Sequence, residues 1–391
     1  MAHFKQNRLY VYAFWGALFF ERSIWINYLQ HQGYSTVQIG FLQTLLTLAM
    51  FIFEFPSGVL SDRLGAKKVM NIGHILIIIY LLALLLNLGY VSLIIGFVAY
   101  GAGLSMISGS DQTLIYQTNP EQSYQHKIGI FEAITIIGLT VSSMIGGYLT
   151  TISWQSIFII EILTQVLSIF ILLFINKESD ETDPDDDEEL MSIKDMFIEL
   201  FSILKLKEIR YLIITISLFQ SSISALLNFA QMLFSAKHLT PFTSATILTI
   251  ALALSAVASV SIEKISQRIG TKRAISIFLG ITLISFAMIK GEYFITLLIA
   301  YFAIEFSFEF VDTSLNAVVQ DASNDQIRTS LISSVNTLTA GLMFLETIII
   351  TSLFSRFGVI DSFVVYGIVA VILTGISFIA FMNQQRKVNN N

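Results

Sequence analysis

The sequence predicts an all-α membrane protein with twelve transmembrane helices in two six-helix, pseudo-symmetric bundles. Of its 391 residues, 54% are hydrophobic and only 13% are charged, and the mean hydropathy is +0.73. A soluble domain carries about 25% charged residues, which excludes that class. Twelve apolar runs are separated by short polar connections, and each has roughly the 20 residues that a spanning helix needs. A short motif also recurs in the second half.

The first apolar run is long and has no small-residue cleavage site after it, so it is expected to be a retained helix. The expected helices are the runs 9–29, 38–60, 70–88, 91–117, 128–151, 154–175, 211–234, 243–262, 274–290, 293–318, 329–352 and 361–382.

The distribution of basic residues predicts the orientation. With both termini cytoplasmic, the outer connections hold only Lys237, Lys290 and Arg356, and Arg22 alone falls within a helix. All other basic residues of the chain's 22 then lie in inner segments. Because cytoplasmic loops are enriched in Lys and Arg, this asymmetry predicts a multi-pass protein of the cell membrane with both ends inside.

One linker interrupts the pattern and divides the chain into bundles 1–176 and 211–391 around segment 177–210. The run Glu178–Glu189 is acidic and contains Pro184, so it is expected to be solvated. It lacks the spaced ligands and turn glycine of a calcium loop, and no metal is expected. Ser192 and Asp195 form a capping-box pattern. An amphipathic surface helix is then expected from the apolar positions Ile193, Phe197, Leu200, Phe201 and Leu204.

The two halves repeat. The segment Arg63–Lys68 (RLGAKK) has a counterpart 205 positions on in Arg268–Arg273 (RIGTKR). Gln125–Lys127 (QHK) is similarly matched 201 positions on by Gln326–Arg328 (QIR), before the equivalent helix. The second copy has lost the acid, because Gln267 stands where Asp62 would. The function of that acid is therefore expected to be asymmetric.

The stretch Gly58–Met70 (GVLSDRLGAKKVM) is interpreted as a short polar hairpin loop between the second and third helices. Glycines would give this turn its backbone freedom. The stretch resembles the signature loop of the major facilitator superfamily, although Ala66 replaces its usual first base. An ordinary basic cytoplasmic loop remains the alternative. The expected conformational latch consists of Gly58, Asp62, Arg63, Gly65, Lys67 and Lys68.

The resemblance implies a transporter built of two parallel halves with a cavity between them at mid-membrane depth. It also implies that Asp62 holds the inner ends of the halves together when the cavity faces outwards. The positive N-terminal end of the eleventh helix, near Thr329, is a physically reasonable partner for that carboxylate.

The fifth helix resembles the glycine motif of the drug:proton antiporter (multidrug efflux) branch. Ser142 and Ser143 replace the Gly-Pro pair of that motif, and close helix packing is the alternative explanation for the glycines. The fourth helix, between Gly96 and Tyr116, also lacks the intramembrane arginine that is usual in drug exporters. The matching glycines are Gly129, Gly138, Gly146 and Gly147.

Charged side chains within the expected helices need a reason, because each costs about 2.5–3.5 kcal/mol at a helix centre on insertion scales. Glu161 and Glu346 lie in aliphatic runs and are predicted to be structural. The candidates for proton coupling or cation attraction are Glu21, Arg22, Glu54, Asp111, Glu132, Glu305, Glu309 and Asp312.

Three interpretations of these acids stay open. In the first, the acids carry protons, since a carboxyl group in a partly dry cavity near a like charge holds a proton readily. In the second, they attract a cationic substrate. In the third, they are structural partners of Arg22 and of hydroxyl groups. Glu305, Glu309 and Asp312 share one helix face, which cannot face acyl chains. The candidates for a substrate cavity are Asn27, Tyr116, Asn228 and Asn316.

The resemblance favours a proton-coupled exporter of small amphipathic or cationic compounds. A symporter importing a nutrient and an exporter of one metabolite are rivals, as is a sensor that no longer transports. There is no cysteine, the five histidines are scattered, and no His-Glu-x-x-His pair occurs, so an enzyme is not expected. The expected partners are a small-molecule substrate and the bilayer, without nucleic acid. We expect a monomer with no cofactor, driven by a proton gradient.

Overall fold

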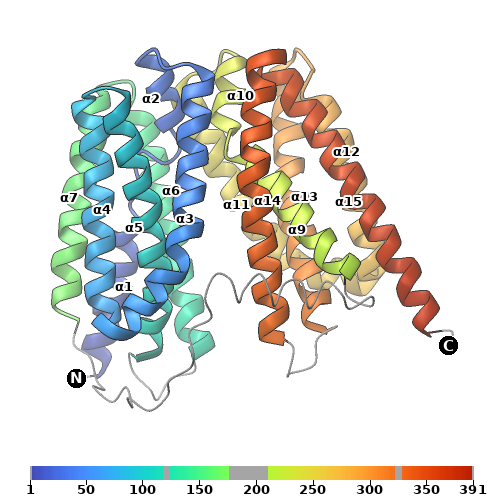
Figure 1. The fold of residues 1–391 in the computed structure, drawn as a ribbon, viewed down its shortest axis with the longest axis horizontal. Coiled ribbons are helices and arrows are strands. Elements are labelled where there is room, and N and C mark those ends of the chain that lie inside the picture. Colours follow the sequence, from blue (N-terminus) through green and yellow to red (C-terminus); the bar gives the residue numbers. More distant parts are fainter. Residues whose placement is uncertain (1, 118–123, 176–209, 322–327, 390–391) are drawn as a thin grey trace. The chain divides into compact units, whose positions relative to one another are not determined.

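A computed structural model describes residues 2–117, 124–175, 210–321 and 328–389. Every element in these residues is a helix (Figure 1). The chain divides into two compact units, Met1–Leu190 with Thr240–Thr246 and Met191–Leu239 with Ile247–Asn391. The predicted acidic run and surface helix lie outside the described residues. The elements are α1 (Ala2–Gly16), α2 (Trp25–His31), α3 (Thr36–Leu64), α4 (Ala66–Leu86), α5 (Tyr90–Gln117), α6 (Tyr124–Leu149), α7 (Trp154–Leu173), α9 (Arg210–Leu227), α10 (Ala230–Ala236), α11 (Pro241–Ile269), α12 (Thr271–Met288), α13 (Phe294–Asp321), α14 (Arg328–Phe357) and α15 (Val359–Asn389).

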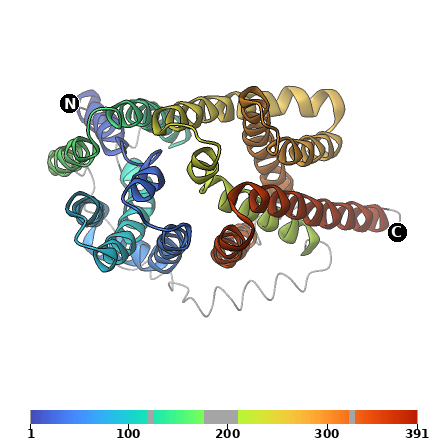
Figure 2. The same ribbon diagram turned by 90° about the horizontal axis from the view of Figure 1, so that it is seen from above.

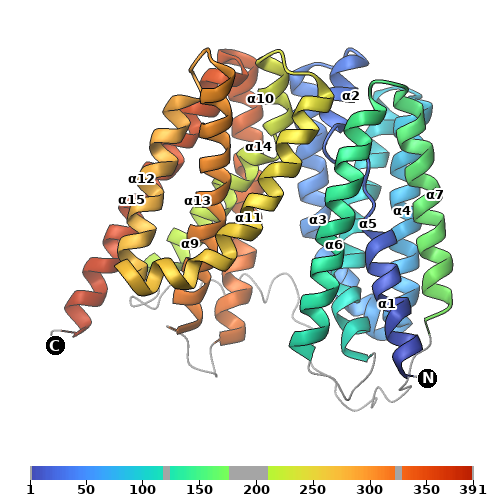
Figure 3. The ribbon, with the colours of Figure 1, turned by 180° about the vertical axis from the view of Figure 1, so that it is seen from behind.

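Eleven helices of the described residues are long and apolar enough to cross a membrane. The twelfth segment is α1 with α2, whose two parts are each too short to be counted alone. In the first unit the helices are seen nearly end-on from above and run roughly parallel (Figure 2). There α5 packs against α3 and α4, and α1 packs against α6 and α7 (Figure 3). The predicted all-helical membrane fold with twelve spanning segments is confirmed.

Two of the predicted helices are broken, so the continuous runs 9–29 and 211–234 are wrong. The chain is non-helical between Gly16 and Trp25, and α9 and α10 are separated by Asn228 and Phe229. A helix break inside a bilayer leaves backbone groups that protein atoms must satisfy, since no water is available. In the first unit that role falls to a side chain of α7, described below.

The interpretation of Gly58–Met70 as a hairpin loop is also wrong. Helix α3 continues to Leu64 and α4 begins at Ala66, so Gly65 alone separates them. Gly65 has φ 87° and ψ 138°, which a residue with a side chain rarely adopts. Gly58 lies inside α3, and therefore the turn does not use its backbone freedom. The connection is shorter than predicted because one left-handed glycine reverses the chain.

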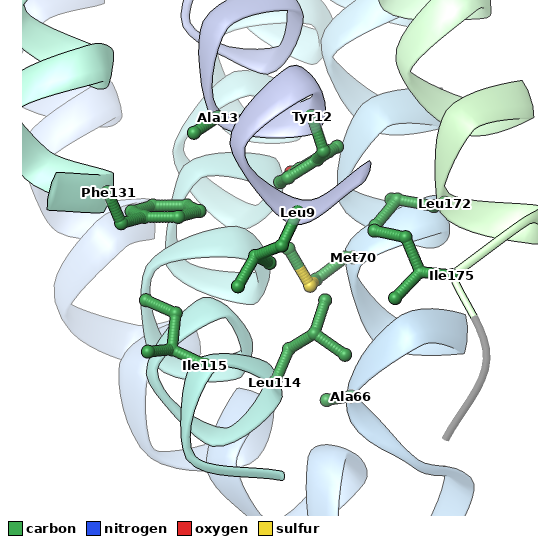
Figure 4. Close-up of a cluster of buried hydrophobic side chains, with 10 residues drawn as sticks. All are labelled: Leu9, Tyr12, Ala13, Ala66, Met70, Leu114, Ile115, Phe131, Leu172 and Ile175. Carbon is green, nitrogen blue, oxygen red and sulfur yellow. The ribbon is translucent and has the colours of Figure 1, made fainter. Parts of the chain in front are cut away.

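A buried cluster joins five helices at the end of α7 (Figure 4). Leu9 and Tyr12 of α1 meet Met70 of α4, Leu114 of α5 and Phe131 of α6, all nearly inaccessible to solvent. Beside the cluster, Lys67 Nζ donates to the carbonyl oxygens of Leu173 (3.5 Å) and Ile175, and Arg8 donates to that of Phe174 (2.6 Å). These cations satisfy the last carbonyl groups of α7, which have no partner within the helix.

The outward faces of the helices are apolar. On α4 the exposed side chains recur at spacings of three and four residues, and exposed side chains on α7 do the same. Rows of this length are too large for the surface of a soluble monomer and suit contact with acyl chains. The exposed residues are Ile72, Ile75, Ile79, Leu82 and Leu86 on α4, and Ile159, Leu163, Leu167 and Phe170 on α7.

Candidate functional site

The break in the first spanning segment contains Glu21, which is completely buried. Tyr80 of α4 donates its hydroxyl to Glu21 Oε2 (3.1 Å), and Tyr100 of α5 donates to Oε1 (3.1 Å). The two phenol rings stack in parallel with centroids 4.1 Å apart. The stacked pair therefore holds one buried carboxyl group by both of its oxygens.

A second buried carboxyl group lies at the same break. Glu161 of α7 is also completely buried, and its Oε2 accepts the backbone N–H of Glu21 at 2.9 Å. The backbone N–H of Phe20 is another donor to this carboxyl group. Because these N–H groups lie where the helix is interrupted, Glu161 replaces the hydrogen bonds that the break removes. Glu161, which is predicted to be structural, thus bonds the backbone at the helix break.

Glycines of α6 make room for the backbone of α1. A Cβ atom on Gly138 would lie 2.9 Å from the carbonyl oxygen of Phe14, and one on Gly146 would overlap the carbonyl oxygen of Phe20. Gly129, by contrast, has no atom within 4 Å of an added Cβ. Two glycines of the expected antiporter motif therefore serve the close approach of α6 to the first segment and its break.

A second polar network crosses the same unit. His74 Nδ1 lies 2.6 Å from Gln165 Oε1, and His74 Nε2 lies 2.9 Å from the Tyr12 hydroxyl. Gln165 Oε1 can only accept, so Nδ1 carries the proton, and in a neutral ring Nε2 accepts from Tyr12. Asp111 of α5 is close enough to interact electrostatically with Tyr12. The network joins α1, α4 and α7 through uncharged hydrogen bonds.

In the second unit, α13 carries the predicted acidic stripe. Tyr301 donates to Glu305 Oε1 (2.7 Å), and Ser259 of α11 donates to Glu309 Oε1 (2.6 Å). Asn316 Nδ2 donates to Asp312 Oδ2 (3.3 Å). All three acids are partly accessible. Within the described residues their partners are hydroxyl and amide groups rather than cations.

The other candidate acids do not gather at one site. Glu54 on α3 and Glu132 on α6 are exposed, as is Arg22 at the break. Glu346 of α14 is buried and accepts from Ser222 of α9 at 2.6 Å, in line with a structural role. The first unit thus brings together Glu21 and Glu161, and the second unit lines up the three acids of α13.

The amide candidates are dispersed as well. Asn27 is buried in α2, Asn228 lies in the break between α9 and α10, and Asn316 belongs to the acidic stripe. The side chains of Tyr116 and Asp62 lie outside the described ones. Around the expected latch Arg63 and Lys68 are exposed, while Lys67 bonds the end of α7. Its role in the described structure is that of a helix cap.

Sequence reasoning missed Tyr80, Tyr100 and the partners of His74. The aromatic residues carry no signal of their own in an apolar helix. Helix α7, however, has its polar residues Glu161, Thr164, Gln165 and Ser168 at spacings of three and four, and all are buried. A polar stripe of this kind on an apolar helix indicates an interior polar face.

Comparisons with known proteins agree with this architecture. The family model described as the Major Facilitator Superfamily matches residues 11–345. An uncharacterized MFS-type transporter of Methanocaldococcus jannaschii is 32% identical over 136 residues, which is 34% of each chain. The hexuronate transporter of Bacillus subtilis (strain 168) is 27% identical over 150 residues, 38% of this chain and 36% of that one. The alignments with these curated relatives thus span about a third of their length.

A crystal structure of a mutant of the nucleoside transporter NupG superposes with a TM-score of 0.78 at 15% sequence identity, covering 98% of this chain and 100% of that one. At this identity the likeness concerns the fold alone. The all-helical fold and the apolar exterior define a multi-pass membrane protein, and the family match points to a transporter rather than an enzyme. The chain belongs to the major facilitator superfamily.

Proposed function

We propose that the protein is a proton-coupled exporter of small amphipathic or cationic compounds, working by alternating access in the cell membrane with both termini cytoplasmic. The observation that carries this proposal is the stripe Glu305, Glu309 and Asp312 on α13. Partly accessible carboxyl groups without a cationic partner in the described residues can bind either a proton or a cation. An antiporter needs a site with both capacities.

Aromatic residues support an amphipathic substrate. Tyr10, Val11, Phe14 and Trp15 line a hollow of about 440 Å³ along one face of α1. Phe14 and Trp15 meet edge to face, with ring centroids 5.9 Å apart. Such a surface binds apolar groups by burial and cations through the ring faces. The hollow on α1 supports the amphipathic character of the proposed substrate, and the acidic stripe on α13 separately supports its positive charge.

A nutrient symporter is the second candidate. The partial relationship to a hexuronate transporter and the fold shared with a nucleoside transporter favour it. A hexuronate is an anion, however, and an ionised acidic stripe would repel it. If the protein is a symporter, the acidic residues of α13 therefore favour a neutral nutrient as its substrate.

The substrate class is tested by accumulation in proteoliposomes with an acidic lumen and the membrane potential clamped. Tetraphenylphosphonium serves as the lipophilic cation, uridine as the nucleoside and glucuronate as the hexuronate. We expect only the cation to accumulate, with loss on adding an uncoupler. Glu309→Gln should abolish accumulation, whereas Glu292→Gln, an exposed acid between α12 and α13, should not. Accumulation of uridine or glucuronate that occurs only when the gradient is reversed, with an alkaline lumen, would replace the export proposal with the symporter.

A further inference from the structure

We infer that Glu21 and Glu161 form a buried carboxyl pair that binds one proton, and that this proton holds the break of the first spanning segment against α7. Binding of the proton follows from the geometry alone. Its part in transport rests on the proposed proton coupling. The pair belongs to the first unit and is separate from the acidic stripe on α13.

The hydrogen bonds of the two carboxyl groups differ. Both oxygens of Glu21 accept phenol hydroxyls, from Tyr80 and Tyr100. Glu161 accepts the Glu21 N–H through Oε2, but its Oε1 is buried and has no hydrogen-bond partner among the residues that the structure describes. An ionised oxygen without a donor is costly at a site that excludes solvent. A protonated Oε1 would instead be a neutral hydroxyl, so the geometry assigns the proton to this oxygen.

The charges around the pair allow one anion rather than two. The titratable groups facing it are the exposed Arg22 beside the break, Tyr80 on α4 and Tyr100 on α5. Arg22 attracts the Glu21 carboxylate and can offset a single negative charge. Two carboxylates sharing one buried site cannot both ionise without a large electrostatic cost. One proton brings the pair and Arg22 to a net charge of zero.

Loss of the proton would act on the helix break. Glu161 holds the backbone at Phe20 and Glu21, and Gly146 of α6 packs directly on Phe20. A second negative charge would push the two carboxyl groups apart. Among the described residues of the first unit that meet at this contact, only those of the break lie outside a helix. The break would therefore move while α4, α5 and α7 stay in place. Proton binding is thereby linked to the conformation of the first spanning segment.

The test is infrared difference spectroscopy of the purified full chain in lipid, recorded between acidic and alkaline pH without any substrate. We expect a carbonyl band of a protonated carboxylic acid that shifts when glutamate is labelled with carbon-13. Glu161→Gln should remove this band, because the amide keeps an acceptor for the Glu21 N–H and supplies a neutral donor. Glu346→Gln, a buried glutamate of the second unit, should leave it unchanged.

Thermal unfolding against pH gives a second measurement. The folded pair holds a proton that the unfolded chain releases at neutral pH, so stability should fall as pH rises in the wild type. This slope should be smaller in Glu161→Gln than in the wild type. Absence of the labelled band in the wild type, or its survival in Glu161→Gln, would overturn the inference. If Glu161→Gln does not fold, the carbon-13 shift of the wild-type band and the fall of wild-type stability with rising pH decide.

The test of the buried proton site can fail or succeed independently of the test of the proposed function. A band that depends on Glu161, in a protein that moves no protons with any substrate, would leave the buried proton site intact and refute only the coupling. Substrate-driven proton flux that persists in Glu161→Gln would support proton coupling and exclude this pair from it.

Discussion

Gly65 and Gly270 have the same backbone conformation, with φ 87° and ψ 138° at the first and φ 85° and ψ 136° at the second. Each is the single residue between two long helices, and they are 205 positions apart. The following lysines repeat as well: Lys67 bonds the carbonyls at the end of α7, and Lys272 bonds Gln385 near the end of α15. The repeat seen in the sequence is therefore a repeated structural device.

Gly65→Ala and Gly270→Ala should each destabilise their unit. Both residues have a positive φ, and at Gly270 no atom lies within 4 Å of an added Cβ, so the cost there comes from the backbone conformation alone. We expect about 1–3 kcal/mol for each. The measurement is thermal unfolding in detergent. Gly280→Ala is the matched control, because Gly280 lies in α12 with equal open space and a helical backbone. Equal stability of all three variants would contradict the prediction.

Gly146→Ala should prevent α6 from packing on the break. The added methyl group would overlap the carbonyl oxygen of Phe20, which is a backbone atom rather than the end of a flexible side chain. Overpacking of this kind costs roughly 1–3 kcal/mol, and the yield of folded protein should fall. Gly129→Ala on the same helix meets no atom within 4 Å and should retain the wild-type yield. Fluorescence-detected size exclusion compares the two. A normal yield of Gly146→Ala would show that the break adapts.

Tyr12→Phe should leave His74 Nε2 without a donor inside the first unit. The Tyr12 hydroxyl is its partner at 2.9 Å, and both side chains are buried. Loss of one partner from a buried pair costs about 1–3 kcal/mol. Tyr293→Phe, at a largely exposed tyrosine, should change stability little. If Tyr12→Phe unfolds at the wild-type temperature, the network does not contribute to stability.

Asp62→Asn should shift the protein towards the inward-open state if the signature motif acts as a latch. Loss of the negative charge removes its attraction for the positive end of a helix. Cysteine probes introduced at inner-facing positions of the cysteine-free chain measure the change, as a faster reaction with a membrane-impermeant thiol reagent. Unchanged reactivity together with normal transport would remove Asp62 from the mechanism.

The spanning segments could be predicted from the sequence because long apolar runs have few other uses. The breaks could not, since Phe19 and Phe20 continue the apolar run into the first one and no proline marks it. Pro56 disfavours a helix interior, yet it lies inside the continuous α3. Helix continuity here is decided by tertiary hydrogen bonds that the backbone at the break donates to Glu161, 140 residues away in the chain from Glu21.

The candidate sites likewise include one that the sequence predicts and one that it does not. The α13 stripe was predictable, because Glu305 and Glu309 are four residues apart on one helix. The contact between Glu21 and Glu161 was not predictable, because the sequence around either residue does not indicate that the other lies nearby. The stretch Gly58–Met70 does not form the predicted loop, because its polar residues extend two helices beyond the apolar core.

The most direct test of proton-coupled export is proton movement driven by substrate in proteoliposomes that contain a pH-sensitive dye. With an acid-loaded lumen, addition of tetraphenylphosphonium should release protons from the lumen in the wild type and in Glu292→Gln. Glu309→Gln should release none. Proton movement that occurs only with a polar metabolite, and in the same direction as that metabolite, would contradict export by antiport and identify a symporter.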